Sequence, residues 1–420
     1  MATAEMETTA MAAAVTHERA LGIESLAREQ FPDRSGRVYL DAATIGLAPY
    51  SAGAAVNRLV EQVIACPADS GTLHHQALGA LRDEARTTVA ELVGARSEDI
   101  ALTESSTHGL GVAAQAIGLD RGDRVLTTDL EFVQMGVVLA QLAGKGVRVD
   151  VVGHEKGVIT LDAIRRQLTP DTRLVAISSV QWTNGFRIDL AGLAQLCRDH
   201  GAWLLVDGAQ HVGVMPMDVR ETPVDILVAS GHKWLNSPFG MGFMYLAPGI
   251  RERLALPMPG FFAAEPPLET WGESFTRPET VPAMDFHFTR DGRAWEIGGT
   301  PNFPGAVALT ATARLAMRIG IGEIAAYSLA LGDRLIEGLD RRGLEVVSPR
   351  DPGARSGIVT FNTGSAEANV ATMEHLLACG IGVSVRYTSG VGGIRVSCHY
   401  FNDTEDIDTL LDALGTRLGT

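Results

Sequence analysis

The chain has 420 residues, of which 46% are hydrophobic and 20% are charged, so it has the composition of a globular protein long enough for two packed units. Its formal net charge of −15 disfavours nucleic acids and anionic membrane surfaces as partners. The four cysteines stand far apart and form no metal-ligand pattern, which predicts no metal site and favours reduced thiols in a cytoplasmic protein.

Residues 1–18 are predicted to form a flexible N-terminal tail. The opening stretch MATAEMETTAMAAAV is small and apolar but carries two Glu and neither Lys nor Arg. A secretory signal needs a basic start, so this stretch does not resemble one. No run in the sequence approaches the roughly 18 apolar residues of a membrane helix, which predicts no membrane partner.

Between about residues 85 and 246, short apolar runs rich in β-formers alternate with helical patterns. The predicted strands are DIALT, DRVLTT, VRVDVV, RLVAISS, AWLLVD, DILVAS and GFMYL, and the helical patterns include 108–118, 161–168 and 190–200. Continuous apolar strands with helical crossovers predict an α/β fold with a mostly parallel sheet covered on both faces. Ligands of such sheets bind at the carboxyl ends of the strands.

The last third of the chain does not continue the alternation of strands and helices. Residues 256–304 are rich in Pro, Gly and aromatic residues without a clear period, which predicts an extended loop that crosses between domains. A long helical pattern at 306–342 precedes the short strands GIVTFN, GIGVSV and GIRVSC and a final helix. We therefore predict a large domain with an N-terminal arm at residues 19–304 and a smaller α+β domain at 305–420.

Lysine is rare in this chain. Only Lys145, Lys156 and Lys233 occur among the 35 basic residues, and only Lys233 follows a buried-looking strand. A lysine, unlike an arginine, can lose its proton near neutral pH and act as a nucleophilic amine. A GC-rich genome is the competing explanation for the low lysine content.

Polar residues gather where the predicted strands end. Asp207 and Gln210 follow one strand, Ser230, His232 and Lys233 the next, and Ser105, Ser106 and Thr107 open a helix after an earlier one. Hydroxyl residues at a helix N-terminus can bind a phosphate, although plain N-capping is the alternative for this segment. A phosphate site, an anionic partner for a ring nitrogen and an amine together indicate pyridoxal 5′-phosphate (PLP).

The segment AWLLVDGAQHVG…DILVASGHKWLNSPFGMGFMYL resembles the cofactor region of class V aminotransferases. The resemblance extends from VYLDAATIG through ALTESSTHGL and EIGGTPNF to RVSCHYFNDTEDID, and so covers most of the chain. This family includes cysteine desulfurases, isopenicillin N epimerase-like proteins, kynureninase-like proteins and cysteine C–S lyases. The resemblance implies the fold type I of PLP-dependent transferases and an amino-acid substrate.

The resemblance also implies roles for single residues around the cofactor. Lys233 resembles the catalytic Schiff-base lysine, Asp207 the partner of the pyridine nitrogen and Gln210 the donor near the ring hydroxyl. Phe132 resembles the residue that stacks on the ring, with core packing as the alternative role. The residues that resemble the phosphate-binding group are Ser106, Thr107, Ser230 and His232.

Two further residues resemble parts of the family's substrate and subunit contacts. Thr300 resembles a residue that reaches the phosphate bound in the partner subunit, which implies a homodimer with a site shared across the interface. Arg395 resembles the arginine that binds the substrate α-carboxylate, and the bidentate geometry of a guanidinium suits that task. A structural ion pair is the alternative role of Arg395.

The sequence departs from the desulfurase pattern in two places. Desulfurases carry a persulfide-forming cysteine before the carboxylate-binding arginine, whereas VRYTSGVGGIRVS has none before Arg395. Cys379 and Cys398 are predicted to fill core space instead, so a persulfide-forming desulfurase is not expected. Many desulfurases also have Asn at the position of Trp182, and the sequence does not decide whether Gln181, Trp182 or Asn184 lines the site.

These features favour a PLP-dependent enzyme that catalyses β-elimination of a cysteine S-conjugate, a C–S lyase reaction. An amino-acid epimerase, an aminotransferase and a decarboxylating deaminase are alternatives on the same fold. A non-catalytic scaffold that binds amino acids is the alternative from another class, and a lack of the yellow colour of bound PLP would favour it. Retention of Lys233, Asp207 and His232 together argues against such a scaffold.

Overall fold

The computed structural model describes residues 22–33, 35–260, 263–266, 268, 270–281, 285–299 and 301–418. The predicted tail at 1–18 and the predicted phosphate-contacting residue Thr300 lie outside the described residues.

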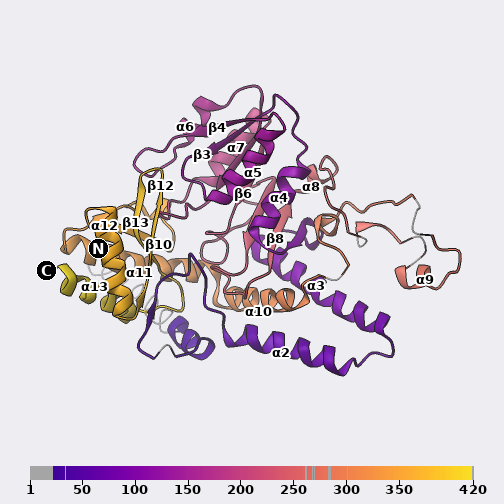
Figure 1. The fold of residues 1–420 in the computed structure, drawn as a ribbon, viewed down its shortest axis with the longest axis horizontal. Coiled ribbons are helices and arrows are strands. Elements are labelled where there is room, and N and C mark those ends of the chain that lie inside the picture. The colour runs from indigo at the N-terminus through magenta and orange to yellow at the C-terminus, as the bar shows by residue number, and fades with distance from the viewer. Residues whose placement is uncertain are drawn as a thin grey trace, which may run out of the picture.

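A seven-stranded sheet forms the centre of the larger part of the molecule (Figure 1). Its strands are β2 (Ile100–Thr103), β3 (Arg124–Thr128), β4 (Arg148–Val152), β5 (Thr172–Ser178), β6 (Trp203–Asp207), β7 (Ile226–Ser230) and β8 (Gly242–Leu246). The spatial order is β2-β8-β7-β6-β5-β3-β4, and only β8 runs antiparallel to its neighbours. The predicted α/β fold with a mostly parallel sheet is confirmed, strand by strand.

Helices cover both faces of this sheet because its strands are apolar on both sides. Leu205 packs into a core beneath α4 (Ser106–Ala116) and α5 (Val133–Gly144). Leu204 and Val206, which point the opposite way along the same strand, pack into a second core. Four helices contribute to that second core, namely α3 (Gly71–Val93), α6 (Leu161–Gln167), α7 (Leu190–His200) and α10 (Phe303–Ile319).

The smaller part of the molecule has its own sheet and core. Its antiparallel sheet has the order β12-β13-β10-β9, formed by β9 (Glu345–Val346), β10 (Ile358–Asn362), β12 (Ser384–Thr388) and β13 (Val391–Ser397). The helices α11 (Ile321–Arg341), α12 (Ala366–Ala378) and α13 (Thr404–Leu418) lie beside it in Figure 1. The N-terminal strand β1 (Val38–Tyr39) pairs with β11 (Ile381–Gly382), which ties the N-terminal segment to this part.

The remaining elements connect these two parts. The helix α2 (Tyr50–Ala65) packs against α10, and the short helices α8 (Pro248–Arg251) and α9 (Trp271–Phe275) follow the large sheet. The described residues include the 3-10 helices η1 (Ser97–Asp99), η3 (Gly292–Trp295) and η4 (Pro352–Ala354). Most described residues of the segment 256–304 are irregular, as its composition indicates.

The prediction of one long helix at 306–342 is wrong. The helix is divided at Gly320, whose φ of 97° lies in a region that a residue without a side chain adopts readily. The axes of α10 and α11 differ by 76° as a result. Helix α10 packs against α2 and α3, whereas α11 packs against α13 and β10. The division of the chain at 304/305 stays a prediction.

Within the described part of the chain, no single helix is long and apolar enough to cross a membrane. Helices α10 and α11 meet the criterion only together, as a span broken by their 76° bend, and both bury apolar side chains in the protein cores.

Candidate active site

A cavity of about 300 Å³ lies where the carboxyl ends of the parallel strands meet the N-terminal segment and the smaller part of the chain. Eight predicted site residues line it, namely Ser106, Thr107, Phe132, Asp207, Gln210, His232, Lys233 and Arg395. Asp207, Gln210, His232 and Lys233 come together because β6 and β7 are parallel neighbours, so the residues at their carboxyl ends share one edge of the sheet.

Lys233 follows β7 by three residues and is partly buried at this cavity. Burial lowers the pKa of its amine to about 8, Asp207 opposes this shift, and Arg395 adds to it. The amine lies 5.8 Å from the centroid of the Phe132 ring. An amine whose pKa is close to neutral can act both as a nucleophile and as a base.

Asp207, the last residue of β6, is a buried acid beside Lys233. Burial raises the pKa of its carboxyl group, while a 2.9 Å hydrogen bond from the Ala209 N–H and the charge of Lys233 oppose the shift. A carboxylate in this position matches the anionic partner that a pyridinium nitrogen requires.

The first turn of α4 and the end of β7 form a group of phosphate-type donors. Ser105 is the N-cap of α4 and accepts a 3.1 Å hydrogen bond from the His108 N–H, so capping accounts for this residue. Ser106 and Thr107 follow it in the first turn, where backbone N–H groups are free to bind an anion. The buried Ser230 hydroxyl has no hydrogen-bond partner among the described residues. This hydroxyl is available to a bound phosphate, but Ser230 itself is not among the residues that line the cavity.

His232 is the remaining member of the predicted phosphate group. Its ring stacks on Phe239 with the centroids 5.1 Å apart. Burial, followed by the charge of Lys233, lowers the pKa of His232 to about 4. The imidazole is therefore neutral near pH 7 and can offer one N–H to an anion.

The Gln210 side chain makes two hydrogen bonds within the protein that the sequence does not predict. Its amide nitrogen donates to the Ala43 carbonyl at 2.9 Å, and its oxygen accepts from the Trp234 indole at 2.7 Å. One amide hydrogen remains for the predicted bond to the cofactor ring. The two contacts connect the N-terminal segment to the residue that follows Lys233.

The aromatic wall of the cavity is formed by Phe132 and Trp182, whose rings meet edge to face at 5.2 Å. Of the three residues left open by the sequence, Trp182 therefore lines the site. Gln181 instead donates to the buried Glu131 carboxylate at 3.1 Å, and Asn184 binds the Gly157 carbonyl at 2.8 Å.

Arg395 lines the cavity and is also ion-paired, so both roles considered for it have a structural basis. Its guanidinium donates to Asp41 at 3.0 Å, to the Thr44 hydroxyl at 2.6 Å and to the Trp182 carbonyl at 2.9 Å. Burial lowers the pKa of Arg395, Asp41 opposes this shift, and Arg386 adds to it.

Sequence reasoning missed four polar residues of the cavity, Thr44, Gln134, Ser178 and Arg386. Thr44 and Arg386 lie in the quoted stretches VYLDAATIG and VRYTSGVGG, but neither has a local pattern that marks it as functional. Thr44 reaches Arg395 only through a contact across 351 residues of sequence, whereas Arg386 lies on the neighbouring strand of the same hairpin.

The cysteines lie away from the cavity. Cys398 is buried in the core of the smaller part, as predicted, whereas Cys379 is exposed at the C-cap of α12. The prediction that Cys379 fills core space is therefore wrong, because this residue is exposed at the end of α12. No cysteine is among the described residues that line the cavity, and Ser389 and Gly390 alone connect β12 to β13.

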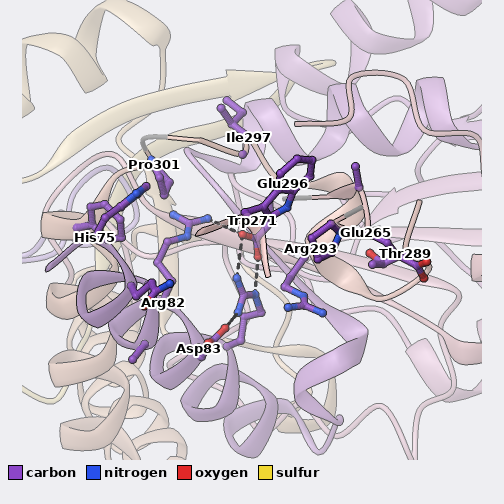
Figure 2. A pocket seen from close by; sticks show the side chains of 18 residues that line it. His75, Arg82, Asp83, Glu265, Trp271, Thr289, Arg293, Glu296, Ile297 and Pro301 are labelled. Atoms are coloured by element: carbon purple, nitrogen blue, oxygen red, sulfur yellow. Dashed lines mark hydrogen bonds and ion pairs between the residues drawn. The ribbon is translucent and has the colours of Figure 1, made fainter. Parts of the chain in front are cut away.

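A second cavity of about 380 Å³ lies beside α3 and the segment 289–303 (Figure 2). Figure 2 shows the Glu296 carboxylate facing the guanidinium of Arg82. Glu296 is the first residue of the EIGGTPNF stretch, and none of the described residues that line this cavity is a predicted site residue.

Comparison with known proteins agrees with the geometry of the first cavity. The family model for aminotransferase class-V matches residues 38–410. The chain belongs to this family. As a class V aminotransferase family member it is a PLP-dependent enzyme that acts on amino acids. The residues that would hold the cofactor are Lys233, Asp207 and the hydroxyl residues Ser106, Thr107 and Ser230.

The relatives within the family carry different names. A probable cysteine desulfurase of Pyrococcus abyssi is 29% identical over 347 residues, which cover 79% of this chain and 82% of that protein. The isopenicillin N epimerase of Streptomyces clavuligerus is 28% identical over 411 residues, or 94% and 100% of the two chains. The structure of the cystine C–S lyase C-DES with its product cysteine persulfide shares the fold, with a TM-score of 0.81, 24% identity and coverage of 92% and 99%.

The names of these relatives oppose the expectation from the sequence that the protein is not a persulfide-forming desulfurase. Cysteine desulfurases are among the similar proteins, so the missing loop cysteine does not exclude a desulfurase. The comparisons confirm the broader part of the prediction, namely a PLP-dependent enzyme that acts on amino acids.

Proposed function

We propose that this enzyme cleaves the Cβ–S bond of a cysteine S-conjugate by β-elimination. The observation that carries the proposal is the composition of the cavity. An amine with a pKa of about 8 and a guanidinium share the cavity, while no cysteine is among its described lining residues. Such a site can remove a proton from Cα and release a thiol, without a thiol of its own lining the cavity to accept sulfur.

Arg395 and Lys233 have separate roles in the proposed reaction. Bound PLP supplies an electron sink for the electrons released at Cα. Arg395 holds the substrate carboxylate in place, which favours loss of the Cα proton over loss of CO₂. The neutral form of Lys233 accepts that proton, and the thiolate leaves from Cβ. With water, the net products are pyruvate, ammonia and a free thiol.

A second candidate is cysteine desulfurase, which the names of the sequence relatives favour. A desulfurase transfers the cysteine sulfur to a thiol acceptor and leaves alanine. Because no described residue lining the cavity is a cysteine, that acceptor would be a thiol brought from elsewhere. The two candidates therefore differ in the carbon product.

The experiment incubates the holoenzyme with S-methyl-L-cysteine and, separately, with L-cysteine plus a dithiol. Pyruvate, alanine, CO₂ and D-amino acid are quantified, with Lys233→Ala as the inactive control. Pyruvate from S-methyl-L-cysteine is expected. Alanine from L-cysteine with no pyruvate from either compound would establish the desulfurase instead. Borohydride reduction and peptide mapping should place a pyridoxyl adduct on Lys233, and an adduct elsewhere contradicts the assigned lysine.

The proposal includes a homodimer with the active site at the subunit interface. It is supported by the resemblance of GGTPN to a segment that reaches the partner's cofactor. Thr300→Ala should weaken retention of PLP without unfolding the protein. Light scattering of wild-type holoenzyme should give the mass of two chains, and a monomer with full PLP occupancy would contradict the shared site.

A further inference from the structure

The second cavity, beside α3, contains a buried guanidinium whose hydrogen bonds are only partly satisfied. Arg82 is 4% exposed and donates from Nη2 to the Glu296 carboxylate at 2.7 Å. Its other terminal nitrogen, Nη1, is buried and has no hydrogen-bond partner among the described residues. Because Arg82 lines the cavity, a molecule bound in the cavity could accept from this nitrogen.

Glu296 cannot supply the missing acceptor. Its Oε1 accepts from the Arg86 Nε at 2.7 Å and from the Leu102 N–H at 2.9 Å. Its Oε2 accepts from Arg82 at 2.7 Å and from the Arg86 Nη2 at 3.2 Å. Each carboxylate oxygen therefore already accepts two hydrogen bonds, which uses its two lone pairs.

The buried charges at this end of the cavity do not balance. The side chains of Arg82, Arg86 and Glu296 are 4%, 10% and 6% exposed, so two buried cations share one buried anion. Asp83 also pairs with Arg86, but its side chain is 67% exposed and water screens much of its charge. The excess positive charge favours an anionic group beside Arg82.

The other charged residues that line the cavity lie nearer to solvent. Arg293 has a partner of its own, since it donates to Asp291 at 2.6 Å, and Glu265 is exposed. Neither changes the balance at the buried end.

The cavity also offers a surface for an aromatic molecule. Trp271 and Phe303 contribute rings to its lining, and its volume of about 380 Å³ falls in the range of small-molecule sites. The Thr289 hydroxyl lines it as well, is buried and has no hydrogen-bond partner in the part of the chain that the structure describes. Figure 2 shows Thr289 and Arg82 on opposite sides of the Glu296 carboxylate.

We propose that this second cavity binds a small aromatic carboxylate. The carboxylate contacts Arg82, the ring lies beside Trp271 and Phe303, and a polar group at the other end of the molecule reaches Thr289. The inference goes beyond the proposed function, because none of these residues lines the cofactor cavity.

The test uses 4-hydroxyphenylacetate as the probe and 4-hydroxyphenylacetamide as its uncharged analogue of similar shape. Isothermal titration of the wild-type holoenzyme should show one molecule of the acid bound per chain. The amide should bind about tenfold more weakly or worse, because the charge-assisted contact to Arg82 is lost. Saturating L-alanine, which occupies the cofactor cavity, should leave binding of the acid unchanged.

Gly79→Leu tests the position of the site without removing Arg82, which balances the buried Glu296. Gly79 lines the cavity from α3, and a Cβ added to it would meet no atom within 4 Å. The leucine should fill part of the cavity and weaken binding of the acid by about tenfold or more, while cofactor content and L-alanine binding stay unchanged. Gly53→Leu is the matched control, because Gly53 is an exposed glycine of α2 with equally open space and lines neither cavity.

Four results would overturn the inference: no binding of the acid, equal binding of acid and amide, displacement of the acid by L-alanine, or wild-type binding by Gly79→Leu. Displacement would place the acid in the cofactor cavity, and absence of binding by a two-chain holoenzyme would indicate that a second copy fills the space. If Gly79→Leu loses its cofactor, the comparison of acid and amide on wild type, with and without L-alanine, decides the question.

Discussion

Two buried glutamates, one beside each cavity, show how neighbours decide what a carboxyl group does. Glu131 accepts hydrogen bonds from neutral donors only: the Thr128 hydroxyl at 2.8 Å, Gln181 at 3.1 Å, and the N–H and hydroxyl of Ser178 at 2.9 Å and 2.5 Å. Glu296 accepts from Arg82 at 2.7 Å (Figure 2). It also accepts from Arg86 at 2.7 Å and from the Leu102 N–H at 2.9 Å.

Their pKa values move in opposite directions. Burial raises the pKa of Glu131 to about 7, its hydrogen bonds oppose the shift, and the charge of Asp207 adds to it. Burial alone would also raise the pKa of Glu296, but Arg86 and Arg82 lower it below the usual value. Neutral donors thus leave a carboxyl group able to change its charge near neutral pH, whereas guanidiniums hold it ionised. Glu131, which can titrate near neutral pH, directly precedes Phe132 in the aromatic wall of the cavity. Glu296, which stays ionised, connects η3 to α3 and β2 through its hydrogen bonds.

The largest effect is expected from Glu296→Gln. Both buried guanidiniums would then face a neutral amide, and removal of one partner from a buried ion pair costs about 3–5 kcal/mol. The free energy of unfolding is measured in urea at pH 7. Glu84→Gln is the control, because Glu84 pairs with Arg314 at 2.6 Å on the surface and such pairs contribute about 1 kcal/mol or less. Equal losses in the two variants would contradict the structural role of Glu296.

The next largest effect is the pH dependence of the stability that Glu131 contributes. The folded-state pKa of Glu131 lies above its unfolded value, so its contribution to stability is complete below about pH 4.5 and is lost as the pH rises through about 7. The stability of wild type relative to Glu131→Gln should fall by about 2–3 kcal/mol between pH 5 and pH 8. The corresponding difference for Glu296→Gln should stay constant there, since its lowered pKa places the loss at more acidic pH. A flat profile for Glu131 would show that Glu131 is not a titrating group in this range.

The smallest effect is expected from Glu131→Gln at pH 7. Its donors carry no charge, and a glutamine keeps one oxygen to accept from them, so the cost should be about 1–2 kcal/mol. Unfolding in urea beside Glu296→Gln measures it under the same conditions. A loss as large as that of Glu296→Gln would mean that Glu131 is ionised and that the contrast between the two regions is wrong.

The predicted site residues that follow local rules were placed together by the fold. Lys233, Asp207 and Ser106 each follow an apolar strand, and parallel strands bring such residues to one edge of the sheet. Arg386 had no such signal, because no local pattern marks it and only the folded hairpin places it at the cavity. The single helix predicted at 306–342 failed for a related reason: both halves are helical by pattern, and the bend at Gly320 lets each pack on a different core.

The amino-acid sequence alone determined the α/β sheet and the PLP-dependent family, and it predicted Lys233 as the cofactor lysine, because periodicity and strand-end chemistry are local properties of the chain. Only the tertiary structure decided the charge of each group. Asp41 reaches Arg395 across 354 residues of sequence, and two of the residues that donate to Glu131, Ser178 and Gln181, lie 47 and 50 residues away from it. Electrostatic interactions act over a few ångströms through the folded interior, so the distances that set a pKa exist only once the chain has folded.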